Sequence, residues 1–281
     1  MRIGSVITTA LMLLTLSTAT VSAQSTDEGW SNFIAEWDAL VRQAEELYAD
    51  DQYVAAVDVS KQALKLARSK VDASHFAVAE SLNNLAFLYH QLHEYSKAEP
   101  LFKQALVIRE KILGPNDTDV VTSLNNLAEL YKADGKYAEA EKYYKRALAM
   151  REKMPQPNHS AVVKSLNNLA ALSKIQGQAT NAEEIYKRAL AIKEQTLRPD
   201  HVDVGVSLNK LAELYQAQGK YDRAEPLFRR ALEIFDIALG PNHATVTLVL
   251  ENLLAVYRAT DRNGEAATTK LRLARARASK D

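Results

Sequence analysis

The apolar positions of this chain recur in short helical stripes that come in pairs. One stripe has members at i, i+3, i+4 and i+7, a spacing that places side chains on one face of a helix. Its members are Leu124, Leu127, Ala128 and Tyr131. A second stripe begins after Gly135 and consists of Ala140, Tyr143, Tyr144, Ala147 and Leu148. The pattern predicts two helices joined by a tight turn at Gly135.

The same pair of stripes recurs along the chain with a fixed period. The string Ser-Leu-Asn-Asn-Leu-Ala, or a close variant of it, begins again after every 42 residues. Its starts are Ser81, Ser123, Ser165, Ser207 and Val249. Small residues of the second stripe keep this spacing at Ala98, Ala140, Ala182 and Ala224. Such a period is the signature of a repeat array, in which each unit packs mainly on its neighbours.

Polar residues in the loops between units follow the same register. They are His75, Asp117, His159, His201 and His243. Residues of this kind accept hydrogen bonds from the first N–H groups of a helix. Because stacked units would hold the histidines far apart, we expect them to cap helices and not to share a metal ion.

These marks resemble the tetratricopeptide repeat. The resemblance rests on L-A-x-x-Y, then G-x-Y-x-x-A, then an aromatic residue or Leu followed by A-L, and it runs from about Trp37 to the C-terminus. The 42-residue period is similar to that of the long variety in kinesin light chains and many bacterial proteins. The resemblance implies an all-α fold, a right-handed α-solenoid of stacked antiparallel helix pairs with about six units. It implies a protein or peptide partner but does not identify one.

The start of the chain has the layout of an export signal. Arg2 supplies a short positive region, Ile3 to Thr20 is apolar, and Val21-Ser22-Ala23 is a small-residue cleavage box. The alternative is an uncleaved membrane anchor, which the cleavage box and the Ser/Thr content disfavour. We therefore expect an exported protein, periplasmic or secreted, from a bacterial source.

The ends of the array depart from the regular units. The chain divides into a signal peptide at 1–23, N-terminal helices with a degenerate capping repeat at 24–80, four regular units at 81–248, and an atypical repeat with a basic helix end at 249–281. We expect Trp30, Phe33 and Trp37 to extend the first helix and cover the end of the core, with an aromatic ligand site as the alternative.

The apolar residues of the last unit depart from the 42-residue register. Ala267, Leu271 and Ala274 fit the second stripe only if one residue is inserted near Asn263-Gly264. The sequence therefore predicts a slip in the last turn of the array. The basic residues that follow favour a solvated helix end, since cations interact favourably with the C-terminal dipole, with an acidic or lipid partner as the alternative.

The amino-acid composition narrows the classes of function that this chain can have. Lys and Arg number 35, Asp and Glu number 35, and cysteine is absent. This balance disfavours a nucleic-acid binder, and the absence of cysteine removes disulfides and thiolate sites. The string His90-x-x-His93-Glu94 lacks the H-E-x-x-H spacing, and no nucleophile elbow or phosphate loop occurs. We expect no enzymatic activity, no cofactor and no metal.

The remaining candidate site is the face of the first helices beside the Leu-Ala stripe. In tetratricopeptide repeats this face lines a concave groove. Its candidate peptide-binding residues here are Asn83, Asn84, Asn125, Asn126, Glu129, Asn167, Asn168, Asn209, Lys210 and Glu213. An amide both donates and accepts, so a ladder of Asn can pair with the backbone of an extended peptide. The alternative is that these amides bond neighbouring helices.

Two specific ligand classes of the family are not expected. Asn168 and Lys210 match the pattern of the two-carboxylate clamp, but Glu129 stands where that clamp has Asn. Asn125 and Val206 replace its lysines. The acidic, Trp-containing peptides of kinesin light chains are not transferred either, because acidic side chains lie in this groove.

The sequence therefore predicts a non-enzymatic scaffold that binds a peptide or protein segment in an Asn-lined groove. One alternative is a structural module that oligomerises through the ends of its solenoid, and another is an accessory or regulatory subunit of an envelope complex. We expect a monomer, no nucleic acid and no membrane span in the mature chain. The partner and the cellular process are left open.

The third regular unit yields a prediction about motion. Ser173 and Ala179 stand where the preceding unit has Tyr131 and Tyr137. Two missing rings leave this turn less packed, so we expect residues 165–190 to exchange amide hydrogens faster than the corresponding residues of neighbouring units. Hydrogen exchange followed by mass spectrometry measures this, and uniform protection across the segment would contradict it.

Overall fold

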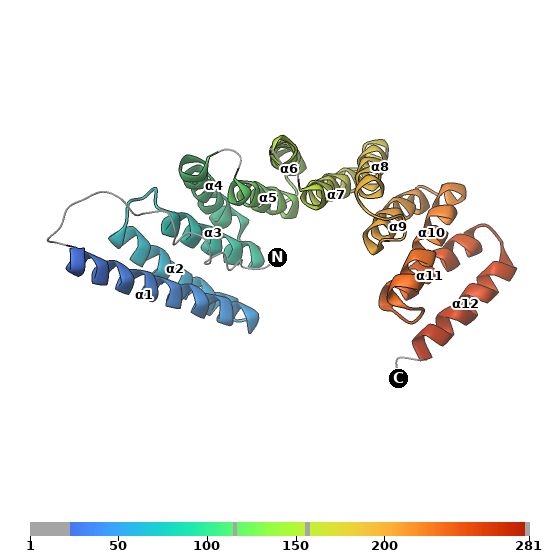
Figure 1. The fold of residues 1–281 in the computed structure, drawn as a ribbon, viewed down its shortest axis with the longest axis horizontal. Coiled ribbons are helices and arrows are strands. Elements are labelled where there is room, and N and C mark those ends of the chain that lie inside the picture. Colours follow the sequence, from blue (N-terminus) through green and yellow to red (C-terminus); the bar gives the residue numbers. More distant parts are fainter. Residues whose placement is uncertain (1–22, 115–116, 155–157, 279–281) are drawn as a thin grey trace. The chain divides into compact units, whose positions relative to one another are not determined.

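The computed structural model describes residues 23–114, 117–154 and 158–278, with side chains from Gly29 onward. The predicted signal peptide, apart from Ala23, lies outside the described residues. Within them the backbone forms twelve α-helices (Figure 1). They are α1 (Ala23–Ala49), α2 (Tyr53–Lys70), α3 (Phe76–Gln91), α4 (Tyr95–Leu113), α5 (Thr118–Ala133), α6 (Tyr137–Lys153), α7 (His159–Ile175), α8 (Ala179–Thr196), α9 (Val202–Ala217), α10 (Tyr221–Leu239), α11 (Ala244–Ala259) and α12 (Asn263–Ala278).

Each 42-residue period folds into a first and a second helix. Within a pair, α3 packs on α4, α7 on α8, and α9 on α10, as Figure 1 shows. The second helix of a pair also packs on the first helix of the next pair, as α4 does on α5 and α10 on α11. This chain of contacts between sequence neighbours is the stacked arrangement that the period predicts, and the all-α solenoid class is confirmed.

The chain forms two compact units, which we call unit 1 (ending at Tyr143) and unit 2 (starting at Tyr144). Each has its own hydrophobic core, with Phe33, Trp37 and Leu82 in unit 1 and Leu208, Phe228 and Leu250 in unit 2. The periodic alanines lie at the closest points of the cores. Ala98, Ala140, Ala182 and Ala224 all have 0% exposure, because only a methyl group fits between the paired helices.

Turns and helix starts follow from single residues. Gly135 has a φ of 73°, in the left-handed region, and joins α5 to α6 as its position predicts. The side chains of His75, Asp117, His201 and His243 each accept a hydrogen bond from a backbone N–H of the following helix. In the third regular unit this role moves by one residue, because Asn158 and not His159 caps α7. The capping prediction is therefore confirmed, with that shift.

The aromatic residues of α1 belong to the core of unit 1. Phe33 and Trp37 are buried at 4% and 6% exposure, and Trp37 Nε1 donates to Ser81 Oγ over 2.8 Å. Trp30 remains 46% exposed and lies edge-on to the His75 ring. The interpretation of Phe33 and Trp37 as packing residues is confirmed, since both rings have internal partners.

The Ser that opens each Ser-Leu-Asn-Asn-Leu-Ala string is a buried acceptor. Arg109 Nη1 donates to Ser123 Oγ over 2.8 Å, and Arg151 Nη1 donates to Ser165 Oγ over 2.5 Å. Each arginine comes from the second helix of the preceding pair. The pair of residues therefore ties one repeat to the next through a hydrogen bond to a charged donor.

Arg109 also holds the carboxylate of Glu80 at 2.5 Å. Burial raises the pKa of Glu80, although the guanidinium acts in the opposite direction. A buried pair of this kind contributes little net stability when intact, but removal of one member leaves an uncompensated charge. The contact therefore favours one register of α3 and α4 over shifted alternatives.

The predicted slip in the last unit is wrong. Ala267, Leu271 and Ala274 are exposed, and the buried face of α12 carries Ala266 and Leu273. Ala266 follows Ala224 by 42 residues, so the register continues without an insertion. The prediction failed because Lys270 and Ala274 occupy positions where α10 has the buried Phe228 and Leu232. This change removes two large apolar side chains from that face of α12.

Gly205 lies inside α9, where a glycine is normally unfavourable. Its place is explained by Phe235, which stands where other units have Arg109, Arg151 or Lys193. A Cβ at Gly205 would lie 2.8 Å from Phe235 Cε1 and 3.2 Å from Ile234 Cγ2. The glycine therefore provides the space that the ring fills.

This contact predicts the sign of a substitution. Gly205→Ala should lower the free energy of unfolding by about 1–2 kcal/mol, because overpacking outweighs the ~1 kcal/mol gain in helix propensity. In a Phe235→Leu background the same change should stabilise the protein. Urea unfolding followed by circular dichroism measures both values, and stabilisation of the wild type by Gly205→Ala would contradict the argument.

Candidate functional site

The candidate site is the exposed face of the first helices, which we call the first-helix surface and describe for each unit separately. In unit 1 it lies on α3 and α5, and in unit 2 on α7, α9 and α11. The question for each amide is whether its polar atoms already have partners inside the protein. An amide with internal partners holds the fold together, whereas one without them is available to a ligand.

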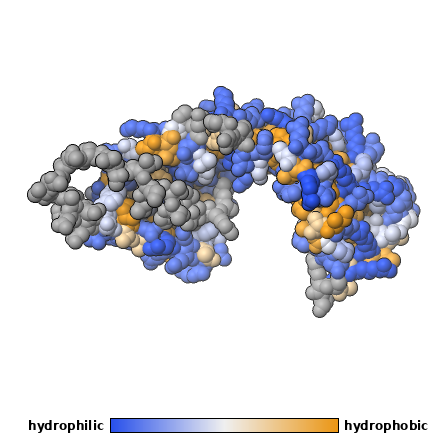
Figure 2. All heavy atoms as spheres, in the orientation of Figure 1, coloured by the Kyte–Doolittle hydropathy of each residue, from blue (hydrophilic) through white to orange (hydrophobic). Residues whose placement is uncertain are grey.

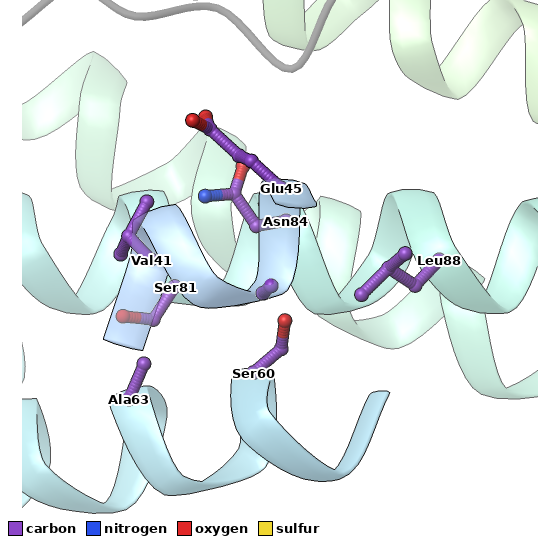
Figure 3. A pocket seen from close by; sticks show the side chains of 8 residues that line it. Val41, Glu45, Ser60, Ala63, Ser81, Asn84 and Leu88 are labelled. Carbon is purple, nitrogen blue, oxygen red and sulfur yellow. The ribbon is translucent and has the colours of Figure 1, made fainter. Parts of the chain in front are cut away.

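Asn84 is a core residue of unit 1. It is 7% exposed and lines a cavity of ≈ 10 Å³ between α1, α2 and α3. Figure 3 shows its side chain beside Glu45, with Ser60 and Ser81 across the same small space. This volume is of the order that holds one water molecule, and the lining is polar enough to bind one. Asn84 thus cannot reach a peptide on the surface.

The carboxyl of Glu45 rims the same cavity. Burial raises the pKa of Glu45, and the nearby carboxylates of Glu80 and Asp38 act in the same direction. The opposing influence of Arg42 is smaller because Arg42 pairs with Asp38 at 2.8 Å. Three carboxyl groups therefore lie near one another at this end of unit 1, and Arg42 and Arg109 pair with two of them, Asp38 and Glu80.

The other amides of unit 1 bond to the protein itself. Asn126 Nδ2 donates to Asn83 Oδ1 over 2.9 Å, which links α5 to α3. Asn125 Nδ2 donates to the backbone carbonyl of Val121 over 2.7 Å. In unit 1 the interpretation of the amides as bonds between and within helices is therefore the one that the geometry favours.

Charged and aromatic groups complete the first-helix surface of unit 1. Glu129 forms an ion pair with Lys132 on the same helix. Burial lowers the pKa of His90, and the carboxylate of Glu129 opposes that shift. His90 Nε2 is buried and has no hydrogen-bond partner among the described residues. The ring is therefore held neutral beside an ion pair.

In unit 2 the first amide of each pair is also turned inward. Asn209 Nδ2 donates to Glu213 Oε1 over 2.6 Å, which holds that carboxylate against α9. The Oδ1 atoms of Asn167 and Asn209 are buried and have no donor among the described residues. These two amides are accordingly oriented toward the protein and away from the surface.

The second residue of each pair in unit 2 is different. Asn168 and Lys210 occupy equivalent positions on α7 and α9, and both are half-buried. Across the described residues neither side chain makes a hydrogen bond or an ion pair. Lys164 and Lys174 are exposed on the same helix as Asn168. Unit 2 therefore presents polar and cationic groups that its own residues leave unsatisfied.

Hydrogen bonds between tyrosine and glutamate side chains, which were not predicted from the sequence, link neighbouring repeats. Tyr131 Oη donates to Glu99 Oε1 over 2.9 Å, and Tyr215 Oη donates to Glu183 Oε1 over 3.0 Å. A lysine lies over each ring, as Lys220 does over Tyr215 at 6.0 Å from the centroid. The signal was present in the sequence, because a Glu follows the periodic Ala in every regular unit.

The third regular unit lacks this tyrosine contact. Ser173 is buried at 4% exposure, and its Oγ accepts a hydrogen bond from Asn181 Nδ2 over 2.8 Å. This bond connects α7 to α8 within one repeat, whereas the tyrosine contacts connect neighbouring repeats. The mobility expected for this unit stays a prediction, and the loss of the tyrosine contact is its structural basis.

A second set of contacts runs along the second helices and is called here the second-helix ladder. Arg188 Nη2 binds Glu152 Oε1 at 2.6 Å, and Arg230 Nη1 binds Glu194 Oε1 at 2.5 Å. Arg272 binds Asp236 in the same way, and each pair is 36 residues apart. These exposed pairs are individually weak but are repeated at each step, so they help to fix the spacing of the helices.

The described parts of the chain give no support for a metal site or for a membrane-spanning helix. They contain no cluster of three or more His, Asp or Glu side chains placed to hold a metal ion. The Nδ1 atom of His93 lies 2.7 Å from Tyr95 Oη. Among the described helices, none is both long and apolar enough to cross a membrane.

The tetratricopeptide repeat family model matches residues 38–111, 77–153, 162–237 and 206–277, which together span most of the chain. The chain is a tetratricopeptide-repeat protein. A search of the curated proteins gives no match. The family assignment explains the helix pairs, the buried alanines and the aromatic positions, but it does not identify a ligand.

Solved tetratricopeptide-repeat structures resemble the chain over most of its length. Nearly identical TPR-like repeats of the kinesin light chain type from Podosopora anserina are 24% identical, with a TM-score of 0.66 and coverage of 73% of this chain and 97% of that chain. BtubC (BKLC) from P. vanneervenii is 25% identical, with a TM-score of 0.63 and coverage of 89% and 91%. A Rap protein complexed with competence and sporulation factor is 17% identical, with a TM-score of 0.53 and coverage of 87% and 75%.

The tetratricopeptide register offers a matched pair of substitutions. Asn126 and Asn168 occupy equivalent positions, but only Asn126 bonds a neighbouring helix. Asn126→Ala should therefore be less stable than Asn168→Ala by about 1 kcal/mol, since the gain in helix propensity cancels in the comparison. Chemical unfolding of the two variants measures the difference, and equal stabilities would show that the Asn126–Asn83 bond contributes nothing.

Proposed function

We propose that the chain is an exported, non-enzymatic scaffold that binds a peptide or protein segment on the first-helix surface of unit 2. Tetratricopeptide repeats form protein-interaction scaffolds, and the fold of this chain is of that kind. The observation that carries the proposal is the state of Asn168 and Lys210. They occupy equivalent positions on α7 and α9, and their polar atoms are without partners among the described residues.

The charges around Asn168 and Lys210 narrow the class of segment that this surface can bind. Lys164, Lys174 and Lys210 lie on or beside this surface. The carboxylates on the neighbouring helices already have partners, since Glu213 accepts from Asn209 and Glu251 pairs with Arg277 at 2.5 Å. The available cationic groups are therefore donors, and the Asn168 amide can also donate. A segment that presents carbonyl or carboxylate oxygens suits them better than a basic one.

Unit 1 is a weaker candidate for the same role. Its amides bond within the unit, and its Glu129 and Lys132 neutralise each other. The Asn-lined groove that the sequence predicts across all repeats thus reduces to a shorter polar surface on unit 2. Asn83, Asn84, Asn125 and Asn126 are assigned to the structure of unit 1.

The surface of α12 argues against the alternative in which the protein oligomerises through the ends of its solenoid. An end-to-end contact would need an apolar outer face there, but Lys270 and Ala274 replace the buried Phe228 and Leu232 of the preceding pair. Without these two large apolar side chains α12 offers a further unit less apolar surface to cover, as expected of a terminal helix that ends a repeat array. A monomer in solution is therefore part of the proposal, and light scattering on the mature chain measures it.

Export is part of the proposal and rests on the sequence of residues 1–23. A mature chain that begins after Ala23 would meet its partner in the periplasm or outside the cell. The absence of cysteine is compatible with such a compartment, where free thiols are prone to oxidation.

The decisive experiment is affinity capture from the native envelope with the mature protein as bait. Asn168→Ala/Lys210→Ala should lose most of the captured partner, while the melting temperature stays within a few degrees of the wild type. The matched control is Gln195→Ala/Lys153→Ala, which removes an exposed amide and an exposed lysine from second helices of the same unit. Quantitative mass spectrometry compares the three baits, and undiminished capture by the first variant would refute the site.

A further inference from the structure

The second-helix ladder has one step in unit 1 that departs from the others. In Glu152–Arg188, Glu194–Arg230 and Asp236–Arg272 an acid on one second helix meets an arginine on the next, 36 residues later. At the α2–α4 step the acid is replaced by Arg68 and the arginine by Gln104. Arg68 Nη2 donates to Gln104 Oε1 over 3.4 Å, a long contact between an ion and a neutral amide.

This substitution leaves a cation without a counterion. Among the described residues Arg68 forms no ion pair, whereas its counterparts at the three regular steps are all carboxylates held by arginine. The nearby Lys103 pairs with Glu99 at 2.7 Å but remains about half exposed. The α2–α4 step thus carries a net positive charge at a position where the ladder is neutral elsewhere.

An open cleft lies at the same step. It has a volume of ≈ 330 Å³ and is lined by Arg68, Ala73, Val78, Leu82, Lys103, Gln104, Val107 and Ile108. Val78 and Leu82 are buried and form the floor, whereas Val107 is 63% exposed and forms part of the rim. Figure 2 shows apolar residues at the surface over the part of the chain that Figure 1 labels α4. The lining contains two cations and no carboxylate.

The equivalent cleft in unit 2 is lined by a different set of charges. It has a volume of ≈ 260 Å³ between α10, α11 and α12. Its walls carry Glu233 and Asp236 as well as Arg229 and Arg272, and Arg272 spans it to reach Asp236. That cleft is balanced in charge and bridged by an ion pair, whereas the cleft on unit 1 is cationic, apolar and without a bridge.

We propose that the cleft between α2 and α4 is a second docking site, which takes an apolar side chain of a protein partner that is flanked by a carboxylate. The apolar side chain would lie on Val78 and Leu82, against Val107. The carboxylate would pair with Arg68 and so supply the acid that this step of the ladder lacks. The site lies on α2 and α4 with its floor on α3, and it shares no residue with the first-helix surface of unit 2.

The expected pairing of Arg68 with a carboxylate follows from the chemistry of the guanidinium group. A guanidinium binds a carboxylate in a bidentate geometry, and the adjacent apolar wall lowers the exposure of that pair to water. The apolar side chain contributes by removal of surface from water, and a single side chain with one ion pair gives weak affinity. We therefore expect dissociation constants on the order of 0.1–1 mM for an isolated short peptide.

The test uses fluorescence anisotropy with the mature full chain and a fluorescein-labelled synthetic peptide that has a central Leu-Phe flanked by Glu. The peptide should bind saturably, and binding should weaken as salt is raised. A peptide with Gln for Glu, or with Ala for Leu-Phe, should bind about tenfold more weakly. No saturable binding of the Leu-Phe peptide, or equal binding of all three peptides, would overturn the proposal.

Variants of the chain locate the site. Arg68→Glu/Gln104→Arg rebuilds the regular ladder pair, so it should keep or raise the melting temperature and reduce peptide affinity about tenfold or more. Arg230→Gln breaks a ladder pair in unit 2 and is the matched control, for which peptide binding should not change. Unchanged binding by the rebuilt pair would show that the peptide lies elsewhere. Competition by oleate but not by unlabelled peptide would assign the cleft to lipid and overturn the protein-partner proposal.

Discussion

The structure depends on how closely two helices approach at the periodic alanines. Ala98, Ala140, Ala182 and Ala224 are completely buried, and a larger side chain at any of them would separate the helices of a pair. The distance they set brings Phe102, Tyr144 and Phe228 into full burial against neighbouring helices. Because each pair has an apolar face that only the next pair can cover, this packing also transmits the arrangement along each unit.

Apolar packing alone leaves the register of the stack weakly specified, since alanine and leucine faces tolerate small shifts. Directional contacts remove that freedom. Tyr131 bonds Glu99, Arg109 bonds Ser123, and Arg188 bonds Glu152, so three different polar contacts link successive second and first helices or successive second helices. Each is modest in energy, but each has a defined geometry that a slipped stack would break. The polar groups therefore specify which packed arrangement is adopted.

The helices, the Gly135 turn and the capping residues could be predicted from the sequence because each depends on residues a few positions apart. The partners of Ser123, Glu99 and Glu152 could not, because they lie 14, 32 and 36 residues away on helices whose relative rotation the sequence does not give. The slip expected near Asn263 failed for a related reason. An exposed apolar residue, Leu271, was assigned to the core, since the sequence alone did not show which face of α12 is turned inward.

The Asn pairs show the limit of a pattern that repeats. Asn126 and Asn168 have the same neighbours in sequence, yet Asn126 bonds Asn83 and Asn168 does not bond a neighbouring helix. Sequence similarity between repeats therefore predicts the position of a side chain but not its partner.

The same reasoning indicates where binding can arise in a repetitive fold. A polar contact that recurs at every step is needed to hold the steps together, so it is not available to a ligand. A residue that differs from its counterparts in other repeats no longer has to make that contact. Lys210 differs in this way from Asn126 and Asn168, and Arg68 differs from Glu152. In this chain both departures introduce a cation without an internal counterion among the described residues. Two separate irregularities thus favour oxygen-bearing partners, one on a first helix of unit 2 and the other on a second helix of unit 1.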